Sequence, residues 1–188
     1  MEELRKIKGV IPNLGKEYII KTFGSEGFNE VLQAMQEQDR EIVSQIILSI
    51  SWQPEKSFMN FLKAVTKTLG KNNLEICRNV GYYAAQEGIP KLYRIFISFG
   101  NPGFVIENCS RFWKHIHSFG SFEATLTNET SAVAKLYTYK DLPKVHCYYM
   151  LGYIQATLEL SGAKNVSVHE AKCTSRNSEY CEFFAKWE

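Results

Sequence analysis

The spacing of apolar residues changes at Gly120, and this change constrains the fold more than any other feature of the sequence. Before it, apolar residues recur at helical intervals, as in Phe28, Val31, Leu32 and Met35. After it, the segment 121–127 alternates apolar and polar residues, which is typical of a strand. Helices followed by strands indicate the α+β class. We expect one domain, 1–188, in which a helical part (1–118) and a mixed part (119–188) share one core.

The mixed part predicts a ββαββ order. We expect strands over 121–127 and 132–139, a long helix over 143–162, and strands over 165–173 and 180–187. Short polar turns join the strands of each pair, so each pair is expected to be antiparallel. The helical N-terminal layer should pack on the resulting four-stranded antiparallel sheet.

The helical part predicts several separate helices, because Gly and Pro interrupt its pattern. One helix should end at Gly24, and a later one, starting near Asn73, should end at Gly88. Between them, a helix starting at Asp39 should turn four isoleucines inward, namely Ile42, Ile46, Ile47 and Ile50.

The composition excludes several classes of protein. The chain has 22 Lys and Arg residues against 20 Asp and Glu residues, a net charge of +2, which does not indicate a nucleic-acid or anionic-membrane partner. No apolar run reaches the roughly 18 residues of a membrane helix, and the charged N-terminus does not resemble a signal peptide. We therefore expect a cytoplasmic protein with no membrane partner. In that compartment clustered cysteines indicate metal ligands more often than disulfides.

Four residues of the mixed part form a candidate metal site: Cys147, Glu170, Cys173 and Cys181. Three thiolates and one carboxylate suit tetrahedral Zn²⁺, and four protein ligands make such a site structural rather than catalytic. Positions 170 and 173 point to opposite faces of a regular strand, so the strand must bulge at residues 171–172. The alternative is that each cysteine is a small buried hydrophobe, which is how we interpret Cys77 and Cys109.

The order of these residues resembles the 4-vinyl reductase domain family. The resemblance rests on Cys147, Gly152, Tyr153, Gly162, Glu170, Cys173, Cys181 and Phe183. It implies a zinc site at the four candidate ligands and a sensory domain that binds an apolar or aromatic molecule. The wider superfamily also contains haem-binding H-NOX domains and small subunits of a Golgi tethering complex, and its layout is similar to that of the whole chain.

The H-NOX relatives hold haem with a histidine and a Tyr-x-Ser-x-Arg motif. This chain offers His115 and His117, but Tyr139 and Asp141 stand where the motif has Ser and Arg. We therefore expect structural zinc rather than haem. His146 and His169 are interpreted as surface or capping residues, and the alternative is that either is a substitute metal ligand or a group that supports the ligands.

A ligand pocket is expected between the helices and the sheet, although the same rings could simply fill the core. The candidate lining residues are Phe96, Phe99, Phe104, Phe112, Trp113, Tyr149 and Tyr153. Many rings and few charges favour a hydrophobic small molecule. No catalytic motif is present, so we expect a sensory domain rather than an enzyme, which signals through a separate partner protein and forms a homodimer. Three alternatives stay open: a haem-based gas sensor, an accessory protein of tetrapyrrole metabolism, and a scaffold.

Overall fold

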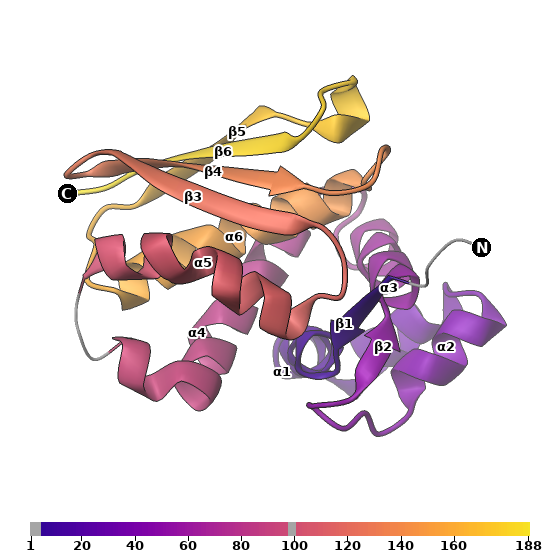
Figure 1. The fold of residues 1–188 in the computed structure, drawn as a ribbon. Helices are drawn as coiled ribbons and strands as arrows, with labels where there is room; N and C mark the ends of the chain where they lie inside the picture. Colours follow the sequence, from indigo (N-terminus) through magenta and orange to yellow (C-terminus); the bar gives the residue numbers. More distant parts are fainter. Residues whose placement is uncertain (1–4, 98–100) are drawn as a thin grey trace.

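The computed structural model describes residues 5–97 and 101–188 (Figure 1). The elements of these two ranges are, in chain order, β1 (Lys6–Lys8), α1 (Val10–Gln33), α2 (Glu37–Ser44), β2 (Trp52–Pro54), α3 (Glu55–Lys67), α4 (Glu75–Ile97), α5 (Pro102–Ile116), β3 (Ser121–Asn128), β4 (Ser131–Tyr137), α6 (Lys144–Leu160), β5 (Ser167–Lys172), the 3₁₀ turn η1 (Thr174–Arg176) and β6 (Cys181–Lys186).

The α+β prediction is confirmed. The C-terminal strands form one antiparallel sheet in the order β3-β4-β6-β5, and α5 and α6 lie along the same face of it (Figure 1). Alternate residues of β4 and β6 turn toward these helices and are buried, among them Leu136 and Phe183. The ββαββ order agrees with the prediction to within a few residues at each boundary. No helix in the described part of the chain is long and apolar enough to cross a membrane.

Helices α4 and α6 pack with their backbones in contact. A Cβ atom placed on Gly81 would lie 1.9 Å from the Tyr149 carbonyl oxygen, and one on Gly152 would lie 1.9 Å from the Arg78 carbonyl oxygen. Each helix therefore presents a glycine to the backbone of the other. This close crossing joins the helical part to the mixed part and fixes α6 beneath the sheet.

The N-terminal part differs from the prediction. Residues 6–8 form the short strand β1, which pairs antiparallel with β2. The predicted helix break at Gly24 is confirmed, because its φ of 72° and ψ of 179° are not helical and a kink there divides α1 into two helical segments. A three-residue strand is too short to show an alternating pattern, so the sequence did not reveal this small sheet. Helix α4 also differs from the prediction, because it continues through Pro90 instead of ending at Gly88.

The predicted inward face of the helix at Asp39 is wrong. Helix α2 ends at Ser44, and the following residues form a loop that turns at residues 49–50. Ile46 and Ile50 are exposed, while Ile47 is buried. The loop is held by backbone hydrogen bonds to the start of α1, from Gly9 and its neighbour in the chain, which replace the helical hydrogen bonds that the pattern predicted.

Candidate functional site

An apolar cavity of about 130 Å³ lies between α5, α6 and the inner face of the sheet. Four of its expected lining residues do line it, namely Phe112, Trp113, Tyr149 and Tyr153. Phe104 is not among the lining residues, Phe99 lies outside the described residues, and the side chain of Phe96 is not described.

Small side chains on the sheet leave the space for this cavity. Its sheet wall contains Ala124 on β3, Ala132 and Ala134 on β4, and Ala185 on β6. Strand interiors usually carry β-branched or aromatic residues, which would fill the space. This row of alanines is the sequence signal that could have located the cavity.

His117 places an imidazole ring in the wall of the cavity. It follows the last turn of α5, and its ring stacks on Trp113 with a centroid distance of 3.6 Å. Its Nδ1 atom is buried and has no hydrogen-bond partner among the described residues. Burial, together with the neighbouring His146, lowers the pKa of His117 to about 3. The imidazole is therefore neutral near pH 7 and carries a lone pair that can bind a metal.

The structure separates the two candidate haem histidines. His115 is exposed on the same helix, whereas His117 turns inward to the cavity. The Trp113 indole donates a hydrogen bond to the Phe119 carbonyl oxygen at 2.8 Å, which fixes the ring on which His117 stacks. Of these two histidines, His117 has the position of a ligand to a group bound in the cavity.

His146 was predicted to be a surface or capping residue, and this is wrong. Its ring is buried, its Nδ1 atom has no partner in the described structure, and burial lowers its pKa to about 4. It lies at the start of α6 with its ring centroid 6.4 Å from that of Trp113, but it does not line the cavity. His169 is exposed on β5, in agreement with its prediction.

In the segment compared with the haem-propionate motif, Tyr139 contacts other residues of the chain. The Tyr139 hydroxyl donates a hydrogen bond to Glu55 at 2.7 Å, and the Arg5 guanidinium lies 3.7 Å from the centre of the tyrosine ring. Glu55 is buried, and burial raises its pKa despite these partners. Lys140 and Asp141 are exposed. Sequence reasoning missed the Arg5–Glu55–Tyr139 group because its members lie far apart in the chain.

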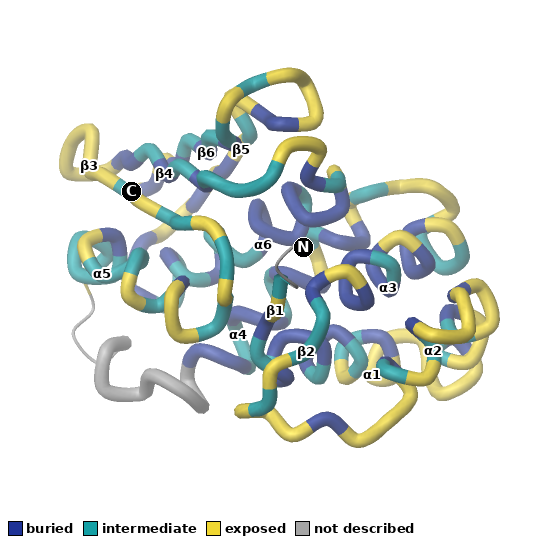
Figure 2. Tube along the Cα trace, turned by 45° about the vertical axis from the view of Figure 1, so that its right-hand side comes forward, coloured by how far each residue is buried: buried dark blue, intermediate teal, exposed yellow. Residues whose placement is uncertain are grey.

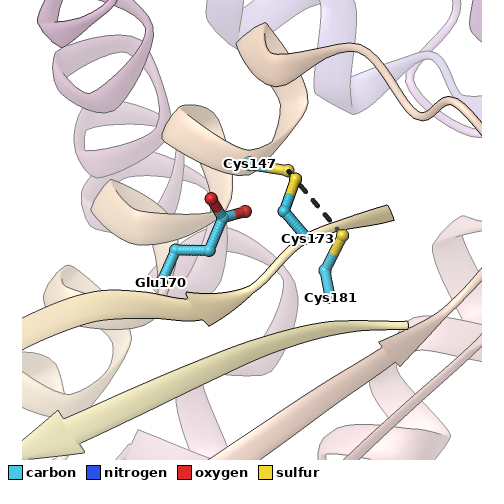
Figure 3. Close-up of side chains that lie close together, drawn as sticks. All are labelled: Cys147, Glu170, Cys173 and Cys181. Carbon is cyan, nitrogen blue, oxygen red and sulfur yellow. Dashed lines mark hydrogen bonds between the residues drawn. The ribbon is translucent and has the colours of Figure 1, made fainter. Parts of the chain in front are cut away.

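The four predicted metal ligands come together beside α6 (Figure 3). The Sγ atom of Cys147 lies 3.6 Å from that of Cys173 and 3.8 Å from that of Cys181, and the four ligand atoms, including an oxygen of Glu170, all lie within 4.8 Å of one another. The register of β5 shifts between Glu170 and Lys172, where the spacing required a bulge. This irregularity lets the strand direct both of its ligands to one point.

The electrostatics of this cluster suit a metal ion. A hydrogen bond from Cys147 lowers the pKa of Cys181 to about 6, although burial opposes this shift. The hydrogen bond to Cys181 raises the pKa of Cys147 and burial raises that of Cys173, so Cys181 is the most readily ionised of the three thiols. Glu170 accepts a hydrogen bond from Arg176 through Oε2, while its buried Oε1 has no partner among the described residues. Sulfur and carboxylate donors arranged in this way match a transition-metal site.

Comparisons with known proteins give the same fold but no family. No family model matches the sequence, and no curated protein matches it. An H-NOX protein from S. oneidensis, solved in the Fe(II)NO state, shares 13% identity over 97% of this chain and 99% of its own, with a TM-score of 0.74.

Two further H-NOX structures agree over nearly the same length. One, from work on haem distortion in the H-NOX family, has 14% identity, a TM-score of 0.72, and coverage of 97% of this chain and 95% of its own. The other, an oxygen-binding H-NOX domain related to soluble guanylate cyclases, has 14% identity, a TM-score of 0.68 and the same coverage. The fold that the resemblance implies is thus confirmed, while the 4-vinyl reductase assignment stays a prediction.

These comparisons correct the cofactor expectation, which was zinc rather than haem. The matching structures are of H-NOX proteins, and their descriptions name Fe(II) or haem rather than zinc. The apolar walls and the unpartnered, neutral His117 fit such a group. The cavity is smaller than the roughly 300–1,000 Å³ of pockets for drug-sized ligands. A porphyrin therefore fits only if α5 moves outward. Such a movement exposes few buried side chains, because only Ile106 and Trp113 of this helix are buried.

Proposed function

We propose that the chain is a haem-binding sensory domain of H-NOX type. The observation that carries the proposal is the buried Nδ1 atom of His117, which has no hydrogen-bond partner in the described structure and belongs to a residue of the cavity wall. The H-NOX structures of the same fold support it. When bound, haem supplies an iron atom that can take a diatomic gas.

The residues of the chain have distinct roles in this proposal. His117 would hold the iron as a neutral imidazole, and Trp113 orients the histidine by stacking on it. The apolar walls exclude water from the site. Arg5, whose guanidinium lies against the Tyr139 ring and pairs with Glu55 at 3.7 Å, would be the cation nearest the motif segment for a propionate, because Asp141 occupies the motif's Arg position.

The test is reconstitution of the purified protein with haem. The wild type should take up about one haem per chain and show a Soret band, and His117→Ala should lose most of that uptake. His115→Ala is the matched control, since it removes an exposed histidine from the same helix. Wild-type protein that takes up no haem, or equal uptake by both variants, contradicts the proposal.

A second candidate function is a sensor for a small aromatic or hydrophobic molecule, as the 4-vinyl reductase resemblance implies. The cavity as it stands favours it, because engineered apolar cavities of about 150 Å³ bind benzene. Benzene and toluene should then raise the melting temperature of the haem-free protein. Haem uptake without any effect of these compounds would leave only the first candidate.

We also propose that Cys147, Glu170, Cys173 and Cys181 bind one metal ion of the kind that thiolates prefer. Such an ion would join α6 to β5 and β6, so its binding energy would add to folding stability. Metal analysis should give about one ion per chain outside haem, and Cys173→Ser and Cys181→Ser should both lose it. Cys109→Ser, outside the cluster, should keep it. Unchanged metal content in both cluster variants would contradict the site.

We propose, finally, that the domain signals through a separate protein and works as a homodimer rather than as an enzyme. No motif for nucleotide or ester chemistry occurs in the sequence, which supports a binding role. Light scattering of the haem-loaded and haem-free protein tests the oligomeric state. A monomer at all concentrations in both forms contradicts the dimer.

A further inference from the structure

The loop between α2 and β2 exposes a concentrated apolar surface. The segment 45–53 contains no charged residue. Three of its side chains are largely exposed, with 98% of Ile46, 70% of Leu48 and 80% of Ile50 accessible, and Trp52 is 41% exposed. Figure 2 shows this segment as mostly exposed. The backbone turns between Leu48 and Ser51, where the Ser51 amide donates to the Leu48 carbonyl at 2.9 Å, so the exposed Leu48 and Ile50 side chains lie on this turn of the loop.

The loop is held in this conformation rather than left loose. Ile47, between two exposed neighbours, is buried against Gly9, where a Cβ atom would lie 2.5 Å from it. The amide of Gly9 donates to the Ser51 carbonyl at 2.8 Å, and the amide of the next residue donates to the Ser49 carbonyl at 3.0 Å. The Asn13 side chain donates to the Ile47 carbonyl at 2.8 Å. The apolar side chains are therefore presented to solvent by a fixed scaffold.

Positive charge lies at the base of this loop. The Lys8 ammonium donates to the Ile50 carbonyl at 2.8 Å and lies 4.0 Å from the centre of the Trp52 ring. The Lys16 ammonium donates to the Gln45 carbonyl at 2.8 Å. Both ammonium groups bind uncharged oxygens, so these contacts leave their charges unneutralised. The nearest acidic residue before the loop in the chain is Glu41 on α2.

We propose that this loop docks the protein on an anionic phospholipid bilayer. Aliphatic side chains at the tip can enter the acyl region, tryptophan prefers the interface, and lysines at the base meet anionic headgroups. The exposed side chains project from a loop with lysines at its base, an arrangement that suits an anionic bilayer. Neither the net charge of the chain nor the length of its apolar runs predicts this contact.

The test is co-sedimentation of the full chain with phosphatidylcholine vesicles that contain or lack phosphatidylserine. The wild type should bind the anionic vesicles, and the combined variant Ile46→Ser, Leu48→Ser, Ile50→Ser should bind them at least about tenfold more weakly. Lys8→Gln and Lys16→Gln should each weaken binding about fivefold, on anionic vesicles only. Ile20→Ser, which removes an apolar side chain of α1 that is 45% exposed, is the matched control and should bind as the wild type does.

Three outcomes would overturn the proposal. The first is wild-type protein that does not sediment with anionic vesicles. The second is equal weakening by Ile20→Ser and by the triple variant. The third is a wild-type protein that does not bind vesicles but forms a concentration-dependent dimer, which the triple variant loses. The loop would then be a contact between two copies of the chain. None of these measurements needs haem, so their outcome is independent of the function proposed above.

Discussion

His117 illustrates how burial gives one residue a chemical role. Its ring is enclosed by Trp113 and the cavity, and its Nδ1 atom gains no hydrogen bond from the described residues in return. Burial without a partner disfavours folding unless another interaction offsets it. The sequence placed this histidine near a helix end, where a solvated, charged form is common. His117 differs from His115 in that its ring points inward, and the spacing of the sequence did not reveal this direction.

The buried histidine should make the haem-free protein sensitive to acid. Its pKa is 6.5 when unperturbed and about 3 in the folded chain, so between these values the unfolded state binds the extra proton. Stability should therefore fall as the pH drops below about 6.5, by up to about 1.4 kcal/mol per pH unit for this residue. Urea denaturation as a function of pH should show a shallower acid slope for His117→Leu. Part of the slope should remain in His117→Leu, because His146 is also buried and its pKa is also lowered. A slope in His117→Leu identical to that of the wild type would refute the effect of His117.

Filling the cavity should separate ligand binding from folding. Ala134 lies on the cavity wall, and Ala134→Leu puts three more carbon atoms into space that is empty in the haem-free chain. We expect haem uptake to fall at least about tenfold, with a change in unfolding free energy below about 1.5 kcal/mol. Haem titration and urea denaturation measure the two effects. Undiminished uptake would place the haem site elsewhere.

At the scale of elements, long patterns were predictable and short ones were not. The strands from β3 to β6 and helix α6 carry enough residues for a period to show, and their order follows from it. The cysteine cluster was predictable as a set, because its members flank the hairpin of β5 and β6 and the start of α6. Strands β1 and β2 have three residues each, too few for a period. The loop with Ile46 and Ile50 follows hydrogen bonds to Gly9, a long-range contact that local spacing does not encode.

The crossing of α4 and α6 should tolerate no added side chain. Gly152→Ala would put a methyl group 1.9 Å from the Arg78 carbonyl oxygen, so the helices must separate. We expect a loss of about 3 kcal/mol or more in unfolding free energy, above the usual range for overpacking, because the obstacle is backbone. In Gly103→Ala the nearest atom is a flexible side-chain oxygen at 3.1 Å, and the change should be far smaller. Equal losses in the two variants would contradict this explanation, and thermal or urea denaturation decides between them.

At the scale of the whole molecule, the parts differ in how firmly they are held. The crossing of α4 and α6 is tight, whereas α5 contacts mainly β3 and covers the cavity. An element with few buried side chains can open at low free energy, which is what a ligand-gated change requires. A sensory domain of this architecture would use α5 as its moving part and the rest as its frame.

Hydrogen exchange should show this division directly. Haem loading should change the exchange rates of the α5 amides by at least about tenfold and leave those of the crossing region of α4 and α6 nearly unchanged. The comparison uses the same protein with and without haem. A uniform change over all helices would indicate general stabilisation instead of movement of one element.

The most direct measurement is magnetic resonance of the haem-loaded protein with isotopically labelled histidine nitrogen. Hyperfine coupling between the iron and one labelled nitrogen is expected in the wild type and in His115→Ala, and its loss is expected in His117→Ala. Coupling that survives in His117→Ala, or that is absent from the haem-loaded wild type, would contradict His117 as the iron ligand, and with it the proposed haem site under α5.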